Sequence, residues 1–156
     1  MIAPRAGQFA HYDSPEARCL LLAIAGQESD WSSRLDASTE GRGFWRCHAR
    51  GLVLNVVTAN VTRPTIAAIC ATLCIPRGLD EVTEACAWND TLAYWIARLA
   101  LVLDPVGLPP LGEAMTAWET YTRVWRPTDP NLSTWPERYG SAAALFATPT
   151  PSQSPT

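Results

Sequence analysis

Residues 14–31 read S-P-E-A-R-C-L-L-L-A-I-A-G-Q-E-S-D-W, and this stretch indicates which class of fold the sequence favours. Ser14 is a preferred N-cap residue, Pro15 suits the first helical position, and an acid follows in the first turn. The apolar run from Cys19 to Ala25 lacks the alternation of a half-buried strand. The stretch therefore predicts a buried helix that ends between Glu28 and Trp31.

Most of the remaining chain also has helical character. Cap residues, prolines and apolar periodicity mark five further predicted helices, at 63–73, 80–87, 91–103, 111–125 and 136–146. The segment 51–58 is apolar and β-branched, and its periodicity leaves strand and helix open. About six helices with short turns and no convincing hairpin predict one all-α domain over residues 1–147. The tail 148–156 is expected to be flexible, because it has no large apolar residue to bury.

The composition excludes several classes of function. The chain has 156 residues, a formal net charge of -3 and no lysine, so we expect no nucleic-acid partner. Its two histidines, His11 and His48, lack ligand spacing to a further His or Cys, so we expect no metal and no cofactor. Cys19, Cys70 and Cys74 lie among Ala, Leu and Ile at helical spacing, which predicts buried, reduced thiols.

The N-terminal residues M-I-A-P-R-A-G-Q-F-A-H contain no apolar core of a signal peptide. Elsewhere, Arg, Asp or Trp interrupts the longest apolar stretches within about a dozen residues, short of the ~20 residues that a membrane span needs. We therefore expect synthesis in the cytoplasm without a signal peptide, and no membrane-spanning segment. A substrate outside the cytoplasm would require another component to carry the protein there.

Glu28 stands out because it follows the apolar run and precedes Trp31. Burial beside apolar and aromatic groups raises the pKa of a glutamic acid from about 4.3 toward ~6, which suits a general acid. The alternative is a solvated glutamate at a helix end. The local sequence by itself favours the solvated residue.

Residues 23–31, A-I-A-G-Q-E-S-D-W, precede a polar loop and then the turn G-R-G-F-W at 41–45. This order resembles the lysozyme-like superfamily, in particular the soluble lytic transglycosylases and their phage relatives. The resemblance covers the first third of the chain. It implies that Glu28 is the catalytic acid and Ser29 the small polar residue after it. It places the turn and its apolar pair at Gly41, Gly43, Phe44 and Trp45.

The same resemblance implies a substrate groove. A weaker match, A-W-N-D at 87–90, corresponds to the family's Ala-Tyr-Asn segment and implies a groove role for Asn89. The family has Gln after the apolar pair, whereas Arg46 stands here, which implies weaker binding of glycan. Aromatic faces suit the apolar side of a sugar ring, and packing in the core is the alternative. The aromatic candidates for glycan contact are Trp31, Trp45, Trp88 and Tyr139.

The resemblance further implies cleavage of peptidoglycan between N-acetylmuramic acid and N-acetylglucosamine. Glu28 would protonate the glycosidic oxygen and then assist attack by the sugar's own 6-hydroxyl, which gives an anhydro product. Hydrolysis with inversion needs a second carboxylate some ~6.5 to 9.5 Å away, and Asp36 and Glu40 are the loop candidates. Asp30 is expected to point to a different side of the helix.

These expectations describe a phage lysis enzyme or virion-associated enzyme that acts in the cell wall. Its partners would be peptidoglycan glycan strands and other phage virion proteins. The alternative is a structural or adaptor virion protein that keeps the fold with reduced or no catalysis, and Arg46 is its main support. Fold resemblance alone does not decide between the two.

Overall fold

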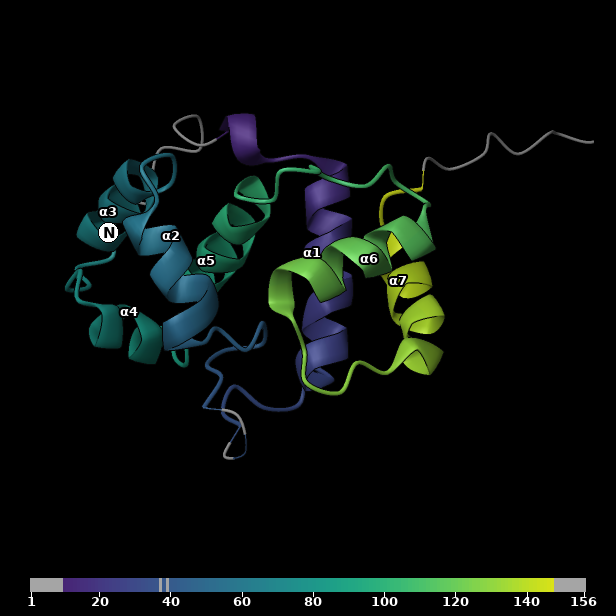
Figure 1. Ribbon diagram of the computed structural model, residues 1–156, viewed down its shortest axis with the longest axis horizontal. Coiled ribbons are helices and arrows are strands. Elements are labelled where there is room, and N and C mark those ends of the chain that lie inside the picture. Colours follow the sequence, from purple (N-terminus) through teal and green to yellow (C-terminus); the bar gives the residue numbers. More distant parts are fainter. Residues whose placement is uncertain (1–9, 37, 39, 148–156) are drawn as a thin grey trace, which may run out of the picture.

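The computed structural model describes residues 10–36, 38 and 40–147, and every regular element in this range is helical. Figure 1 shows their arrangement. The α-helices are α1 (Pro15–Ser29), α2 (Leu54–Thr58), α3 (Arg63–Thr72), α4 (Leu79–Ala85), α5 (Asp90–Val102), α6 (Ala114–Trp125) and α7 (Trp135–Ala144). Shorter helical turns are η1 (Ala10–Tyr12), η2 (Ala49–Val53) and η3 (Leu132–Thr134). The predicted all-α fold is confirmed.

α1 begins where the sequence predicts and forms the centre of the core. The Ser14 Oγ accepts a hydrogen bond from the Ala17 N–H at 3.2 Å, which caps the helix. Leu20 and Ile24 are fully buried, because α1 contacts both α5 and α7. A helix with neighbours on two sides needs apolar residues around most of its surface, which explains the long apolar run.

The other helices form two groups on either side of α1 (Figure 1). One group contains α2, α3, α4 and α5, and the other contains α6 and α7. The last turn of α1 and the loop that follows it lie between the two groups, at the lower edge of the view. Residues from both groups can therefore meet at the end of α1.

The segment that the sequence left open between strand and helix is helical. η2 runs directly into α2, with Gly51 in a non-helical conformation at φ -122° and ψ -108°. Val53 and Val56 are fully buried, so these β-branched residues pack in the helical core. η2 contacts α4, α5 and α6, and it thereby joins the two groups.

Some predicted bounds differ from the observed ones. α6 begins at Ala114 instead of residue 111, because Gly112 has a left-handed φ of 95° and delays the helix. α4 and α7 each end two residues earlier than expected.

The cysteines are free, and four of the five are buried. The prediction of a buried Cys74 is wrong, because its side chain is exposed. α3 ends at Thr72 and the φ of Cys74 is 56°, so the helical periodicity that suggested burial has already stopped.

Two sequence predictions concern the ends of the chain and its relation to membranes. The expected flexible tail, 148–156, lies outside the described residues, as do residues 1–9. Within the described part, no single helix has the length and apolar character to cross a membrane. The segments 49–58 and 63–72 meet that test only as a pair, with a bend of 100° between them.

Candidate active site

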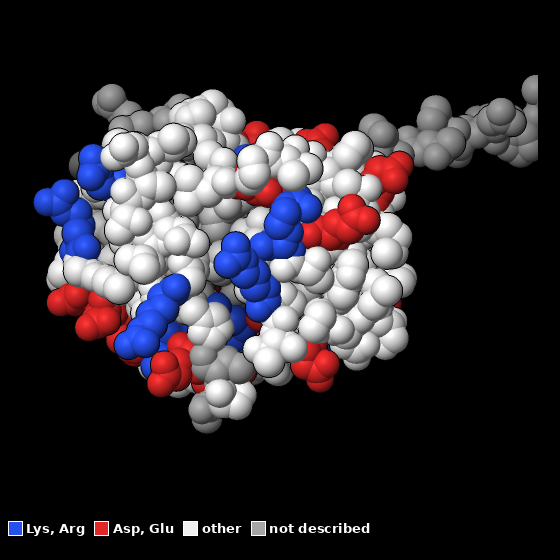
Figure 2. Space-filling view, viewed as in Figure 1, with Lys and Arg blue, Asp and Glu red and all other residues white. Residues whose placement is uncertain are grey.

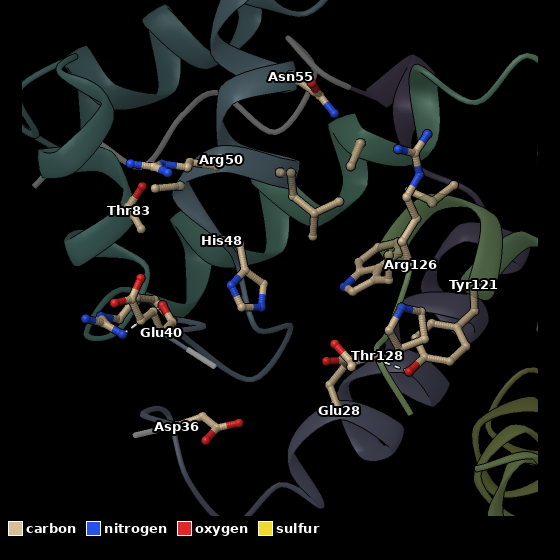
Figure 3. Close-up of a pocket in the computed structure, with 18 of the residues that line it drawn as sticks. Glu28, Asp36, Glu40, His48, Arg50, Asn55, Thr83, Tyr121, Arg126 and Thr128 are labelled. Atoms are coloured by element: carbon tan, nitrogen blue, oxygen red, sulfur yellow. Dashed lines mark hydrogen bonds between the residues drawn. The ribbon is translucent and has the colours of Figure 1, made fainter. Parts of the chain in front are cut away.

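A cleft of about 1750 Å³ opens between the two groups of helices. Its walls come from the last turn of α1, the loop that follows it, η2, α4, the end of α5 with the turn after it, and the segment from 121 to 131. Figure 3 shows the side chains that line it, and Figure 2 shows arginine side chains gathered across the middle of the same face. Most lining residues are polar or charged, which suits a polar ligand.

The end of α1 places Glu28 in this cleft. Asp30 and Trp31 both have left-handed backbones, with φ of 50° and 55°, so the chain turns sharply away after the helix. The Asp30 N–H donates to the Gly26 carbonyl at 2.9 Å and closes the helix end. Consecutive left-handed residues other than glycine are uncommon, and such strain is often found at functional sites.

Glu28 is partly buried, and among the described residues one side chain is hydrogen-bonded to its carboxyl. The Tyr121 hydroxyl, on α6, donates a hydrogen bond to Glu28 Oε1 at 2.6 Å (Figure 3). Burial raises the pKa of Glu28 above its ordinary value, and the negative charge of Asp36 adds to this rise. The Tyr121 hydrogen bond and the charge of Arg46 act in the opposite direction, but burial has the larger effect on the pKa.

Tyr121 is held by other aromatic rings. Its ring stacks on that of Trp135, with 5.4 Å between centroids and 8° between planes. The Trp135 Nε1 donates to the Ala114 carbonyl at 2.7 Å, which fixes α7 against the start of α6. Burial, together with the charge of Glu28, raises the pKa of Tyr121, so its hydroxyl keeps its proton and remains a donor to the carboxylate.

Gln27 connects the acid's helix to the opposite rim of the cleft. Its Nε2 donates to the Asn131 carbonyl at 2.9 Å, and its Oε1 accepts from the Thr134 hydroxyl at 3.0 Å. Asn131 lines the cleft, so both bonds hold this rim against the last turn of α1.

Both candidate second carboxylates line the cleft. Asp36 and Glu40 lie on the side away from Tyr121, with His48 above them in Figure 3. Asp36 Oδ1 accepts from the N–H and the hydroxyl of Ser38, at 2.8 and 2.6 Å. Burial lowers the pKa of His48, although Asp36 and Glu40 oppose this, so its imidazole is mostly neutral at pH 7.

The turn residues that the resemblance named support the cleft from behind and do not line it. Ser29 is buried and its hydroxyl donates to the Ala25 carbonyl at 2.8 Å. Gly43 has a φ of 72°, and a Cβ there would lie 2.5 Å from the Cys86 carbonyl oxygen, so only glycine fits. Trp45 is buried, and its Nε1 donates to the Leu21 carbonyl at 2.9 Å.

The aromatic residues predicted to contact glycan lie elsewhere. Trp31 packs on Phe44 with 5.2 Å between ring centroids and is 44% exposed. Trp88 is 75% exposed, outside the cleft. Tyr139 is buried, and its hydroxyl accepts from the Gly112 N–H at 3.1 Å, so Tyr121 is the tyrosine beside the acid.

Asn89 has a structural role at the start of α5. Its Oδ1 accepts from the Leu92 N–H at 2.9 Å, which caps the helix. Neighbouring Asp90 receives two hydrogen bonds from Arg34, at 2.9 and 2.7 Å. This segment therefore fastens the loop after α1 to α5, at a distance from the cleft lining.

Arg46 also has a structural role. Its guanidinium is buried and donates to the Ser33 carbonyl at 2.9 Å and to the Glu28 carbonyl at 3.4 Å. It ties the loop to the last turn of α1 and does not line the cleft. The weaker glycan binding that the resemblance implied for this position stays a prediction.

Tyr121 and Trp125 also line the cleft, and the sequence analysis assigned neither of them to the site. Tyr121 and Trp125 belong to an apolar helical pattern that indicates packing, and Tyr121 is separated from Glu28 by 93 positions. The Trp125 Nε1 donates to the Trp45 carbonyl at 2.9 Å, which fixes its ring at the cleft wall. No local motif signals either role.

The described residues contain no group of three or more His, Cys, Asp or Glu that could hold a metal ion. Comparison of the chain with protein-family models, with curated proteins and with solved structures found no match.

Proposed function

We propose that this protein cleaves the glycan strands of peptidoglycan, with Glu28 as the general acid. The observation that carries the proposal is the carboxyl of Glu28, which is partly buried in a polar cleft, has a raised pKa and receives the Tyr121 hydroxyl at 2.6 Å. A raised pKa allows a carboxylic acid to hold its proton near neutral pH and to donate it to a leaving group. The resemblance of residues 23–45 to lytic transglycosylases names the substrate.

The proposed reaction begins with transfer of the Glu28 proton to the glycosidic oxygen, as the bond from that oxygen to the anomeric carbon of N-acetylmuramic acid breaks. The carboxylate so formed then accepts the proton of the sugar's 6-hydroxyl, whose oxygen attacks the anomeric carbon. The product is an anhydro sugar, and Glu28 regains its proton. Only one carboxyl group is required for this route.

Tyr121 suits both halves of the reaction. A donor at 2.6 Å stabilises the carboxylate that forms when Glu28 has given its proton away. The aromatic rings around Tyr121 keep the phenol in place as the charge changes. Trp125 offers a fixed ring in the same wall on which a sugar could stack.

Hydrolysis is the second proposed route, and it is favoured by the positions of Asp36 and Glu40 in the cleft. Both carboxylates line the cleft on the side away from Tyr121, where either could activate a water molecule (Figure 3). The product would then carry a reducing end instead of an anhydro ring.

Digestion of purified sacculi, with mass spectrometry of the soluble fragments, tests the proposal. The wild-type protein should release anhydro-muropeptides, and Glu28→Gln should release them at least about 100-fold more slowly, because the amide has no acidic proton. Glu137→Gln is the matched control, since Glu137 is exposed on α7 and outside the cleft. Reducing ends would identify hydrolysis. If the wild type releases no fragment, the proposal fails and a structural virion protein becomes the better account.

A further inference from the structure

Four arginines of the described part of the chain line the cleft, and two of them are neutralised by neighbours. Arg42 pairs with Glu84, with 3.0 Å between Nη2 and Oε1. Arg123 binds both carboxylate oxygens of Asp104, at 2.9 and 2.6 Å, and the Asp104 side chain is only 1% exposed. These two guanidiniums are therefore paired with carboxylates in the walls of the cleft.

Arg50 and Arg126 are different. Neither guanidinium has a hydrogen bond or ion pair with any residue of the described chain. Figure 3 shows them on opposite sides of the cleft, Arg50 on the side of η2 and Arg126 on the side of α6, with His48 between and below. Both residues are exposed, so a ligand in the cleft can reach them.

The backbone at Arg126 does not favour an arginine. This residue caps α6 in a left-handed conformation with φ of 50°, and its N–H donates to the Thr122 carbonyl at 3.0 Å. Glycine or asparagine is the usual residue in this cap, because other side chains are strained there. The chain thus carries a guanidinium at a cleft position whose backbone geometry alone would favour glycine.

The cleft as a whole does not suit a polyanion. Seven carboxylates line it against four guanidiniums, and these carboxylates would repel a continuous row of phosphates. The seven are Glu28, Asp36, Glu40, Asp80, Glu84, Asp104 and Asp129. Two unpaired guanidiniums in such surroundings suit a neutral chain that carries isolated carboxylates at its sides. A glycan strand with peptide stems has this distribution of charge, because its sugars are neutral and its carboxylates are on the peptides.

We infer that Arg50 and Arg126 bind carboxylates of the stem peptides, so that the cleft selects glycan that still carries charged peptides. The inference rests on the proposed function, since it names a part of the same substrate. A planar guanidinium binds a carboxylate through two parallel hydrogen bonds, which gives geometric as well as electrostatic selection.

The test compares two preparations of the same sacculi, freed of other wall polymers. One is intact, and the other has its peptide carboxylates converted to amides with carbodiimide and ammonium chloride. Binding is measured by co-sedimentation of the full-length Glu28→Gln protein, which does not require cleavage. Intact sacculi should bind several-fold more tightly than amidated sacculi, and the preference should shrink as ionic strength rises from 50 to 500 mM in the assay, about the range over which charges become screened.

The variants are Arg50→Gln, Arg126→Gln and the double variant, each in the Glu28→Gln background and each checked by thermal melting. Each substitution should lower the preference for intact sacculi about two- to fivefold, the range of a solvent-accessible ion pair, and the double variant should abolish it. Arg126→Lys should keep only part of the preference. Arg77→Gln is the control, because Arg77 is exposed between α3 and α4 and lies outside the cleft.

Equal binding of intact and amidated sacculi, or a preference that persists in the double variant, overturns the inference. Either result leaves the proposed function standing if the wild type cleaves both preparations. A preference that depends on both arginines without any cleavage by the wild type would have the opposite meaning, with the binding site supported and the enzymatic proposal rejected.

Discussion

The wall of the cleft formed by α6 is backed by packed aromatic rings of α6 and α7, whereas the opposite wall carries polar and charged side chains, among them Asp36, Glu40 and Arg50. On the aromatic side, Tyr121 stacks on Trp135, and Trp118 packs against both rings with centroids within 5.5 Å. On the polar side, Ser38 and Glu40 are exposed.

The two walls act on Glu28 in different ways. The aromatic wall supplies one donor in a fixed position, and it sets the environment of the acid by burial. The polar wall supplies charges that act on the acid through space, such as that of Asp36. Removing the Tyr121 hydroxyl from the aromatic wall should raise the pKa of Glu28, whereas removing the charge of Asp36 from the polar wall should lower it.

Among the variants that test this difference between the two walls, Tyr121→Phe should have the largest effect on activity. It keeps the stacked ring but removes a hydrogen bond to a charged group, so we expect activity to fall on the order of 10-fold or more. That hydrogen bond lowers the pKa of Glu28, so its loss should raise the pKa and move the falling limb of the pH–activity profile to higher pH.

The control is Tyr94→Phe, since the Tyr94 hydroxyl has no hydrogen-bond partner among the residues that the structure describes. The pH profile of cleavage for both variants is the measurement. A Tyr121→Phe profile that coincides with that of the wild type would show that the tyrosine does not act on the acid.

Asp36→Asn should shift the pH–activity profile in the direction opposite to that expected for Tyr121→Phe. The charge of Asp36 raises the pKa of Glu28, so its removal should move the falling limb to lower pH. If Asp36 acts only through its charge, we expect a rate change of a few-fold at the optimum. If it activates water, the loss should be on the order of 100-fold, and reducing ends should disappear from the products.

Glu40→Gln tests whether Glu40, instead of Asp36, is the base that activates water. A loss on the order of 100-fold in this variant alone would assign the base to Glu40. A shift in the same direction for Tyr121→Phe and Asp36→Asn would contradict the proposed opposition between the walls.

Arg46→Gln should lower stability and leave the cleft surface unchanged. Its buried guanidinium donates to two carbonyls at the junction of the loop and α1, so we expect a loss of about 1–3 kcal/mol in the free energy of unfolding. Urea unfolding is the measurement, with Arg77→Gln as an exposed control expected to stay within about 0.5 kcal/mol. A gain in glycan binding without loss of stability would instead support a direct substrate role for position 46.

The smallest effect concerns the stability of Glu28→Gln as a function of pH. Burial raises the folded pKa of Glu28 above its ordinary value of 4.5, so the native state holds this proton more tightly than the unfolded state. The native state therefore loses stability as pH climbs from about 4.5 through the raised pKa. Glu28→Gln removes this loss, and it should be more stable than the wild type at pH 7 but not at pH 4.

Melting temperatures of the two proteins at both pH values check this sign. An advantage of the same size at pH 4 and pH 7 would mean that the carboxyl of Glu28 is not perturbed by burial.

The sequence predicts the features that depend on neighbouring residues. Ser14 and Pro15 start α1, and Asn89 starts α5, because caps act within one helical turn. Residues brought together by packing are not predictable in this way. Tyr121 meets Glu28 only because α1 lies between the two helical groups, and its sequence context is that of an ordinary core residue.

The predicted site also shows what a family pattern transfers. Gly43 and Trp45, which the resemblance named, shape the backbone and the core behind the cleft. The resemblance named them because they are close in sequence to Glu28. Tyr121 and Trp125, which line the cleft, come from a distant element, and their identification requires the three-dimensional structure.

The position of α1 has a consequence for how the protein folds during synthesis. Among the described α-helices, α1 leaves the ribosome first and α7 last, yet α7 is the element that α1 contacts most extensively. Until residues near 144 have emerged, the fully apolar surface around Leu20 and Ile24 lacks part of its cover. Such contacts between distant parts of a chain slow folding, and exposed apolar surface promotes association of incomplete chains. Nascent chains stalled before α7 should therefore recruit chaperones, and release from them should coincide with the completion of the last helix.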